Sequence, residues 1–380
     1  MGAISSTIQS LPPLGDFIRL TPDAYRVALN IFQYFPLFTT LEWLTPYYPA
    51  GKSSLPKATL NIPGRLGWML MELIGPLNLL YILRTQCSNL GIDSLPLPNK
   101  LVVALYLIHY VNRAIVSPLM APSVSPTHVF IVASAVCFNW LNSTCLAGWV
   151  LGYEVLWEGF EDLASSGAAV SAGNGNSTAV WVTSLLGTLV FALGMAGNIY
   201  SERTLFRLRR EEVAKRSSSS SSSTSSSAPT EEKTTSTPKD TTNKESKNKY
   251  SKVYVIPPPK GPFTSILYPH YVFEWAEWFG FALAGTAIQP LLIPSLLAGI
   301  GSKTAVTAVS PLRLAPWFVP AAKVAGALGV PLPLAGLAFA VNTVANLLPH
   351  ARWGRKWYVG RFGEEGVKGR GAVVPWCPWL

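Results

Sequence analysis

The chain has 380 residues and a formal net charge of +10, and 49% of its residues are hydrophobic while only 13% are charged. A soluble globular domain carries about 25% charged residues, so this composition excludes an ordinary soluble domain. Nucleic-acid binding is also disfavoured, because the Lys and Arg residues flank apolar segments instead of lining one soluble face. The four cysteines form no CxxC pair and no Cys/His spacing typical of a zinc site, so no metal is expected.

Seven apolar segments are long enough to cross a hydrocarbon core of about 30 Å as helices, which predicts an all-α, polytopic membrane protein. Pro36 weakens the first segment, and the Gly-, Ala- and Pro-rich last segment is expected to contain a break or to form two shorter helices. Residues 1–20 lack a basic region followed by an apolar core, so the first span, and not a cleaved signal peptide, is expected to direct insertion. The predicted spans cover residues 22–44, 66–83, 101–120, 127–152, 179–200, 272–300 and 314–348.

The distribution of Lys and Arg predicts the orientation of the spans. Residues 203–216 and the tail from Arg352 to Arg370 are rich in both, whereas residues 153–178 contain neither and hold four acids. Seven spans place the two basic stretches on one side, predicted to be cytosolic, and the N-terminus and the acidic loop on the luminal side. Asn176 begins an Asn-Ser-Thr sequon on that luminal side, which is either glycosylated or an unused sequon in a flexible loop.

Residues 216–249 form a Ser/Thr/Lys tract that has too few apolar residues to offset chain entropy, so disorder is expected there. The tract is either a phosphorylated regulatory loop or an inert insertion. The predicted organisation is a luminal segment, five spans, a cytosolic loop and a C-terminal region with the last spans and the basic tail. These parts cover residues 1–21, 22–200, 201–253 and 254–380.

Polar and ionisable side chains inside the predicted spans are candidate functional groups, because charges within a membrane usually face the bundle interior or a cavity. His109 and Arg113 are one helical turn apart and share a face, as do Glu274 and Trp278. Glu277 is expected on the other side of its helix from Glu274, or near the surface. The candidates are Glu72 in the second span, His109, Tyr110 and Arg113 in the third, and Glu274 and Glu277 in the sixth.

Such a set of side chains suits the polarisation of a carbonyl and the binding of phosphate. Two simpler interpretations stay open: Arg113 could extend toward lipid headgroups, and the aromatic residues near span ends could form an interface belt. The residues alone indicate a membrane enzyme or a transporter with a buried polar site.

Several motifs, in order along the chain, resemble the steroid 5α-reductase family (3-oxo-5α-steroid 4-dehydrogenases), in a fungal- or plant-like form. YYPAGKSS, PGRLGWMLMEL and LIHYVNR are similar to the N-terminal half of that family. LGMAGNIYSERTLFRLRR, YVIPPPKGPF, YPHYVFEWAEWFG and RKWYVGRFGEEGVKGRGAVVPW are similar to its C-terminal domain, apart from the Ser-rich insertion. The resemblance covers most of the chain from about residue 47.

The resemblance implies a seven-helix enzyme of the endoplasmic reticulum membrane that encloses a cofactor and substrate cavity. Members use NADPH to reduce a carbon–carbon double bond conjugated to a carbonyl, most simply in a 3-oxo-Δ4-steroid. The sequence has no Rossmann GxGxxG motif, so the dinucleotide is expected within the helical bundle. Very-long-chain enoyl-CoA reduction and polyprenal reduction are alternatives. A transporter or scaffold would explain the spans but not the motifs.

The resemblance also implies roles for individual residues. Glu72 and Tyr110 would hydrogen-bond the substrate carbonyl, with Tyr110 as the acid, and Glu72 could donate only when protonated, a form that burial favours. Tyr48 and Trp278 would line the substrate pocket. The expected cofactor contacts are Arg113, Asn198, Glu202, Arg209, Tyr254, His270, Glu274 and Tyr358, with Arg209 suited to the NADPH phosphates.

Other positions depart from the family pattern and leave the substrate and some nicotinamide contacts open. Met71 stands where the family has Gln, and Glu202 replaces an Asp. Arg352 and Arg355 could partly compensate for the Arg and His that the family has before its final Trp-Tyr. The remaining departures are His270 and Ala121, each in place of an Asn, and His350 and Gly354, in place of that Arg and His.

Overall fold

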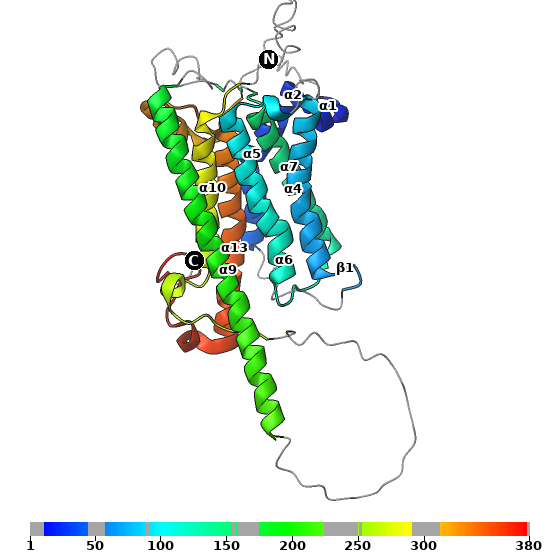
Figure 1. The fold of residues 1–380 in the computed structure, drawn as a ribbon, viewed down its shortest axis with the longest axis vertical. Helices are drawn as coiled ribbons and strands as arrows, with labels where there is room; N and C mark the ends of the chain where they lie inside the picture. Colours follow the sequence, from blue (N-terminus) through cyan, green and yellow to red (C-terminus); the bar gives the residue numbers. More distant parts are fainter. Residues whose placement is uncertain are drawn as a thin grey trace, which may run out of the picture.

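The computed structural model describes residues 11–44, 58–87, 92–153, 155, 157–158, 175–223, 250, 253–290 and 312–377. These residues form a bundle of roughly parallel helices, with a short antiparallel ribbon at one end (Figure 1). The ribbon pairs β1 (Asn61–Ile62) with β2 (Thr127–His128). The all-α, polytopic fold predicted from the sequence is confirmed.

Five of the described helices are long and apolar enough to cross a membrane. The second, third, fourth, fifth and seventh predicted spans each match one of them. They are α4 (Gly64–Gln86), α5 (Leu97–Tyr110) continued by a π-helix (Val111–Val116) and α6 (Ser117–Met120), α7 (Val129–Val150), α9 (Ser177–Ser223) and α13 (Leu334–Val367).

The first predicted span, 22–44, is divided into α2 (Pro22–Tyr34) and α3 (Pro36–Leu44). The division falls at Pro36, which lacks the N–H that would continue the hydrogen bonds of α2. A short α1 (Leu14–Arg19) precedes them, and the Thr21 side chain caps α2 by accepting from the Ala24 N–H at 3.3 Å.

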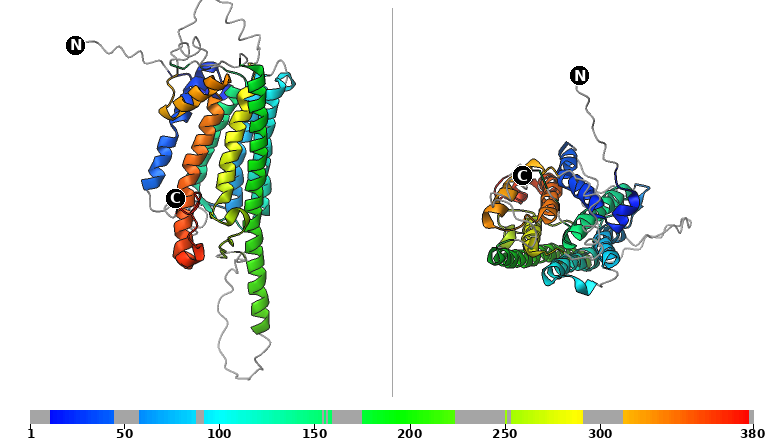
Figure 2. Two further views of the ribbon diagram at one scale, coloured as in Figure 1. Left: turned by 90° about the vertical axis from the view of Figure 1, so that its left-hand side faces the viewer. Right: turned by 90° about the horizontal axis from the view of Figure 1, so that it is seen from above.

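The sixth predicted span, 272–300, corresponds to α10 (Pro269–Ala284) followed by a 3-10 turn (Gly285–Ala287), and residues 291–300 lie outside the described part. Helix α10 lies between α9 and α13 (Figures 1 and 2). Glycines allow α9 and α10 to touch along their backbones: a Cβ on Gly194 would overlap the backbone of Glu277, and one on Gly280 would overlap that of Phe191. This contact leaves the face of α10 that carries Glu274 and Glu277 inside the bundle.

The last predicted span, 314–348, contains the expected break. A 3-10 turn (Pro316–Phe318) and α12 (Val319–Leu328) end at Gly329, whose φ of 67° closes the helix in the left-handed conformation. Helix α13 then begins at Leu334 and continues to Val367, well beyond the predicted end. Short 3-10 turns at Ile92–Ser94 and Gly261–Phe263 complete the elements of the described part.

The described segments that flank the acidic and basic stretches lie at different ends of the bundle (Figure 1). The end of α7 and the start of α9, which flank the acidic loop, lie at the end of the bundle that also holds α1 (Figure 1). The basic second half of α9 and the end of α13 lie at the opposite end (Figures 1 and 2). Most of the acidic loop lies outside the described residues, so the predicted orientation stays a prediction.

The predicted start of disorder at residue 216 is wrong, because α9 continues as a helix to Ser223, past the other helices (Figure 2). Ion pairs one turn apart stabilise this extension: Arg207 Nε lies 3.8 Å from Glu211 Oε1, and Arg216 Nε lies 2.8 Å from Glu212 Oε1. Adding a residue to an existing helix also avoids the cost of a new nucleus. Residues 224–249 lie outside the described part.

Candidate active site

Arg113 joins three helices in the bundle interior. Its Nε lies 3.3 Å from Glu72 Oε1 on α4, and its Nη1 lies 3.8 Å from Glu274 Oε2 on α10. The guanidinium also lies over the Trp68 ring, 4.6 Å from its centroid. The alternative in which Arg113 extends toward headgroups is therefore wrong.

The position of Arg113 depends on the π-helix of residues 111–116. One π-helical turn accommodates an extra residue and shifts the register of the side chains that follow, and such turns are frequent at functional sites. His109 and Arg113 both contact acidic residues of α10, as their shared face predicted.

His109 and Glu277 form a second buried pair. The distance from His109 Nδ1 to Glu277 Oε1 is 2.6 Å, and the Glu277 side chain is 0% exposed. The prediction that Glu277 lies away from Glu274 or near the surface is therefore wrong. Residues three apart are neighbours on a helix, and the close contact of α10 with α9 leaves this face inside the bundle.

Tyr110 adjoins the two acidic pairs. Its hydroxyl donates to Asn139 Oδ1 on α7 at 3.2 Å, and Asn139 Nδ2 donates to the Met71 carbonyl on α4 at 2.6 Å. Tyr110 and Asn139 are both buried. The residue beside Met71 is Glu72, so these hydrogen bonds connect Tyr110 to the backbone next to Glu72, the other residue that the resemblance assigns to the substrate carbonyl.

The Trp278 ring packs against His109 and Tyr110 and is 1% exposed. Its ring centroid lies 4.4 Å from that of His109, 6.4 Å from that of Tyr110 and 4.3 Å from that of Phe339 on α13. This buried ring belongs to the core of the bundle, so for Trp278 the interface-belt alternative is wrong. Aromatic rings on one side and ionisable groups on the other make a surface suited to an apolar molecule with one polar end.

The buried cluster around Arg113 and His109 holds more acidic side chains than basic ones. Three carboxylates, of Glu72, Glu274 and Glu277, face one guanidinium and one imidazole. The region therefore has more groups that can accept a proton than fixed positive charges.

A second group of predicted residues lies toward the basic end of the bundle. Glu202 on α9 accepts a hydrogen bond from the Ser117 hydroxyl at 2.6 Å, and Arg203 Nη2 donates to Asn112 Oδ1 at 3.1 Å. Asn198 is buried one turn before Glu202. These contacts connect α9 to the π-helix that carries Arg113.

Arg209 and Arg370 occupy this basic end with neutral partners. Arg209 Nη2 donates to Ser123 Oγ at 2.7 Å, and its Nε donates to the Val253 carbonyl at 3.1 Å. Arg370 Nη1 donates to the carbonyls of Pro257 and Phe263, at 2.8 and 3.2 Å. Neither arginine has a carboxylate partner within the part of the chain that the structure describes, so both keep their charge available to an anion.

Three predicted aromatic contacts surround these arginines. Tyr358 on α13 is near enough to both Arg209 and Arg370 for an electrostatic interaction. The Tyr254 ring centroid lies 4.7 Å from that of Trp357, and the His270 ring centroid lies 4.5 Å from that of Tyr271. Tyr48 lies outside the described residues.

The donors of this end fit an anionic dinucleotide. The fully buried Ser201 hydroxyl, Arg203 Nη1 and Trp275 Nε1 have no hydrogen-bond partner among the described residues. A buried donor without a partner is costly, and phosphate or carboxamide oxygens would satisfy such donors. Arginines with neutral partners beside these donors supply the complementary charge.

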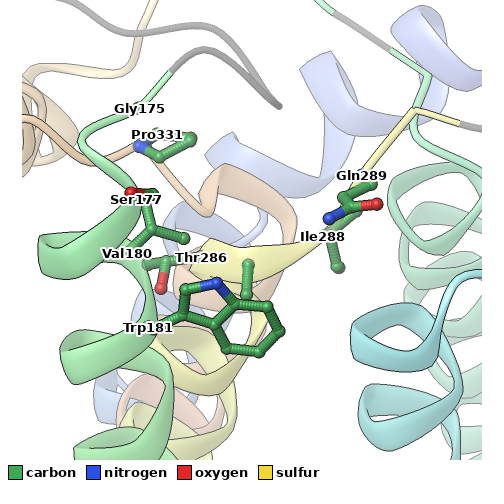
Figure 3. Close-up of a pocket in the computed structure, with 9 residues that line it drawn as sticks. Gly175, Ser177, Val180, Trp181, Thr286, Ile288, Gln289 and Pro331 are labelled. Atoms are coloured by element: carbon green, nitrogen blue, oxygen red, sulfur yellow. The ribbon is translucent and has the colours of Figure 1, made fainter.

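A separate cavity lies at the opposite end of the bundle, between the start of α9, the turn after α10 and Pro331 (Figure 3). It has a volume of about 100 Å³, below the roughly 300–1,000 Å³ of ligand pockets. Its lining includes Ser177, Trp181, Thr286 and Gln289, and the described residues of the lining contain no acid or base. This cavity therefore lacks the groups that the chemistry predicted above requires.

Comparison with known proteins identifies the family. An uncharacterized protein of Schizosaccharomyces pombe is 30% identical over 278 residues, which are 70% of this chain and 83% of the relative. The steroid 5-alpha-reductase DET2 of Solanum lycopersicum is 25% identical over 90% of this chain and 91% of its own length. The 3-oxo-5-alpha-steroid 4-dehydrogenase 1 of Mus musculus is 24% identical over 92% and 94%. The chain belongs to the steroid 5α-reductase family. No protein-family model matches the sequence.

Several departures from the pattern of the steroid 5α-reductase family have a structural counterpart. A Cβ on Gly354 would overlap the Tyr268 hydroxyl, so the Tyr268 ring fills the space that a side chain at 354 would need. His350 Nε2 lies 3.9 Å from Glu42 Oε2 on α3. Arg355 is buried and donates to the Arg370 carbonyl at 2.8 Å, so it holds the tail in place.

One residue of the site, Asn139, was missed from the sequence, and Glu277 was a candidate whose position was predicted wrongly. Asn139 lies in an otherwise apolar span with Asn142, Ser143 and Thr144. Polar side chains in a membrane helix usually face other helices, and that signal could have identified Asn139. The role of Glu277 depends on the close contact between α9 and α10, which a single span does not reveal.

Proposed function

We propose that the protein is an NADPH-dependent membrane reductase that saturates the carbon–carbon double bond conjugated to the carbonyl of a lipid. The simplest substrate is a 3-oxo-Δ4-steroid, which would become the 5α-reduced 3-oxosteroid. The observation that carries the proposal is Arg113, which joins Glu72 on the carbonyl side to Glu274 on the cofactor side. The names of the plant and mammalian relatives support the same reaction class.

Tyr110 and Glu72 are proposed to bind the carbonyl oxygen of the substrate. Reduction develops negative charge on that oxygen, and hydrogen-bond donors placed there in advance stabilise the charge strongly in a site without bulk water. Tyr110 donates its phenolic proton, and Glu72 donates in its protonated form. When bound, NADPH supplies the hydride that adds to the β carbon, and a proton completes the product at the α carbon.

The cofactor phosphates are assigned to the basic end, and the nicotinamide to the side of Glu274. Arg209, with the free Nη1 of Arg203, would bind phosphate oxygens. Asn198 and Glu202 on α9 would contact the middle of the dinucleotide, and the remaining contacts would come from Tyr254, His270 and Tyr358. Arg113 orients Glu274 and Glu72 relative to each other.

The proposed location is the endoplasmic reticulum membrane, with the basic end of the bundle and the tail in the cytosol. Cytosolic loops carry an excess of Lys and Arg, and the cytosol supplies NADPH to that end. Trp278 and the adjoining aromatic rings would contact the apolar body of the substrate, together with Tyr48.

The test is an assay of purified protein in membranes with NADPH and a panel of enone steroids, enoyl-CoAs and polyprenals, with products followed by mass. Turnover of a steroid enone is expected, and turnover of only an enoyl-CoA or a polyprenal would reassign the substrate within the class. Glu72→Gln should reduce turnover strongly, while Glu212→Gln, a matched change on the exposed extension of α9, should not. Absence of both turnover and NADPH binding would contradict the proposed enzyme and favour a transporter or scaffold.

A further inference from the structure

Asn139 occupies a bridging position in the proposed site. It is 6% exposed and lies near the middle of α7, away from any helix end. Its carboxamide contacts Tyr110 at the end of α5 through Oδ1, at 3.2 Å, and α4 through Nδ2, at 2.6 Å from the Met71 carbonyl. Both ends of one short side chain are therefore used, and each end contacts a different helix.

The Met71 carbonyl fixes the direction of these hydrogen bonds. A carbonyl oxygen can only accept, so the NH₂ group of Asn139 must face Met71 and Oδ1 must face Tyr110. The Tyr110 hydroxyl then has to donate to Oδ1. In this arrangement the phenolic proton of Tyr110 points at Asn139.

The turn of α4 that Asn139 contacts precedes a proline within the helix. Pro76 lies inside α4 and has no N–H, so the Glu72 carbonyl four residues earlier loses its usual helical donor. A proline of this kind bends a helix and opens the carbonyls on the preceding turn. Asn139 donates to the neighbouring Met71 carbonyl, on the turn that carries Glu72, while its Oδ1 accepts from Tyr110.

We propose that Asn139 is a positioning residue for the carbonyl-binding pair, an inference that rests on the proposed reductase function. It holds the Tyr110 proton until substrate binds and sets the distance between Tyr110 and the turn of Glu72. When a carbonyl enters, the Tyr110 hydroxyl turns from Oδ1 to the carbonyl oxygen. Only hydrogen bonds are exchanged, and the proton stays on Tyr110 until the carbonyl gains charge.

A purely structural role for Asn139, as a tie between α4 and α7, is the competing explanation. Asn78 offers a matched control, because it joins the same two helices without contacting Tyr110. Its Nδ2 donates to Ser143 Oγ at 2.9 Å and to Thr144 Oγ1 at 3.0 Å. Loss of a helix tie can therefore be separated from loss of the contact with Tyr110.

The kinetic test compares Asn139→Ala with Asn78→Ala, each in the wild-type and the Tyr110→Phe background. Asn139→Ala should lower kcat by about 10- to 100-fold with KM within about threefold, because a displacement of about 1 Å can cost about 100-fold. Asn78→Ala should change kcat by less than about threefold. In the Tyr110→Phe background the Asn139→Ala effect should nearly disappear, since residues that act together are not additive.

An equal loss in both backgrounds would show that Asn139 acts independently of Tyr110 and would overturn the proposal. Asn139→Gln keeps both polar groups, so it should recover part of the kcat lost in Asn139→Ala; this variant also serves if the alanine protein fails to fold. No recovery by a folded Asn139→Gln protein, together with an Asn78→Ala loss as large as that of Asn139→Ala, would equally count against the proposal.

A second measurement does not need turnover. The NMR signal of ¹³Cζ-labelled Tyr110, identified by its loss in Tyr110→Phe, should shift in Asn139→Ala and stay in place in Asn78→Ala. An unchanged signal in Asn139→Ala would overturn the hydrogen bond on which the inference depends. A wild-type protein that turns over none of the panel would contradict the proposed function instead, so the two failures are distinguishable.

Discussion

The interior cluster and the basic end of the bundle hold arginine in opposite ways. In the interior, Arg113 has carboxylate partners on two helices, at 3.3 and 3.8 Å. At the basic end, Arg209 and Arg370 are held by carbonyls and a hydroxyl. A guanidinium with carboxylate partners is neutralised and serves to orient them, whereas one with neutral partners keeps its charge for an anion. Under the proposed function, this difference fits carbonyl chemistry in the interior and phosphate binding at the basic end.

Removal of the hydroxyl of Tyr110, the proposed acid, should have the largest effect of the variants that compare the two regions. Tyr110→Phe keeps the buried ring and removes only the hydroxyl, so kcat for an enone substrate should fall by about 100-fold or more. NADPH affinity should change by less than about threefold, because the basic end is untouched. Initial rates and equilibrium NADPH binding measure the two effects. Full activity in this variant would show that Tyr110 is wrongly assigned.

Removal of the interior guanidinium should come next. Arg113→Met leaves Glu72 and Glu274 without a cationic partner, and breaking a buried ion pair from one side costs about 3–5 kcal/mol. Thermal unfolding of the protein in lipid nanodiscs should therefore show a marked fall in Tm. The further changes Glu72→Gln and Glu274→Gln should restore much of the lost stability, and failure to do so would mean that Arg113 stabilises the bundle by packing alone.

A substitution at the basic end should have a smaller effect, and it should change only the affinity for NADPH. Arg209→Met should raise the Kd for NADPH by about 10- to 100-fold, because a hydrogen bond to a charged group contributes about 1.5–3 kcal/mol. Arg207→Met is the matched control, since the Arg207 side chain is 66% exposed and pairs with Glu211. Equal losses of affinity in the two variants would indicate a general effect of positive charge instead of a specific contact.

The smallest effect is expected on the extension of α9. Glu212→Gln removes the pair with Arg216, and pairs of this type on an exposed helix contribute about 0.3–0.5 kcal/mol. Neither Tm nor NADPH binding should change measurably. A large fall in Tm would show that the extension packs more tightly against the rest of the protein than its exposure indicates.

Much of the molecule could be predicted from local signals. The positions of most spans and the break near Gly329 follow from hydropathy and glycine. Glu72, Arg113 and Glu274 stood out because ionisable groups are rare within spans. The extension of α9 to Ser223 could not be predicted from composition, because a helix already formed extends through weak helix formers at little cost.

The sequence by itself determined which side chains are available to the site: the acids, the arginine and the tyrosine within the spans, and the basic residues at one end. The tertiary structure decided which of them meet. The close contact between α9 and α10 at their glycines accompanies the pairing of Glu277 with His109, the π-helix carries Arg113, and Asn139 contacts both Tyr110 and the Met71 carbonyl of α4. These pairings depend on contacts between helices far apart in the chain, which the periodicity of a single span does not encode.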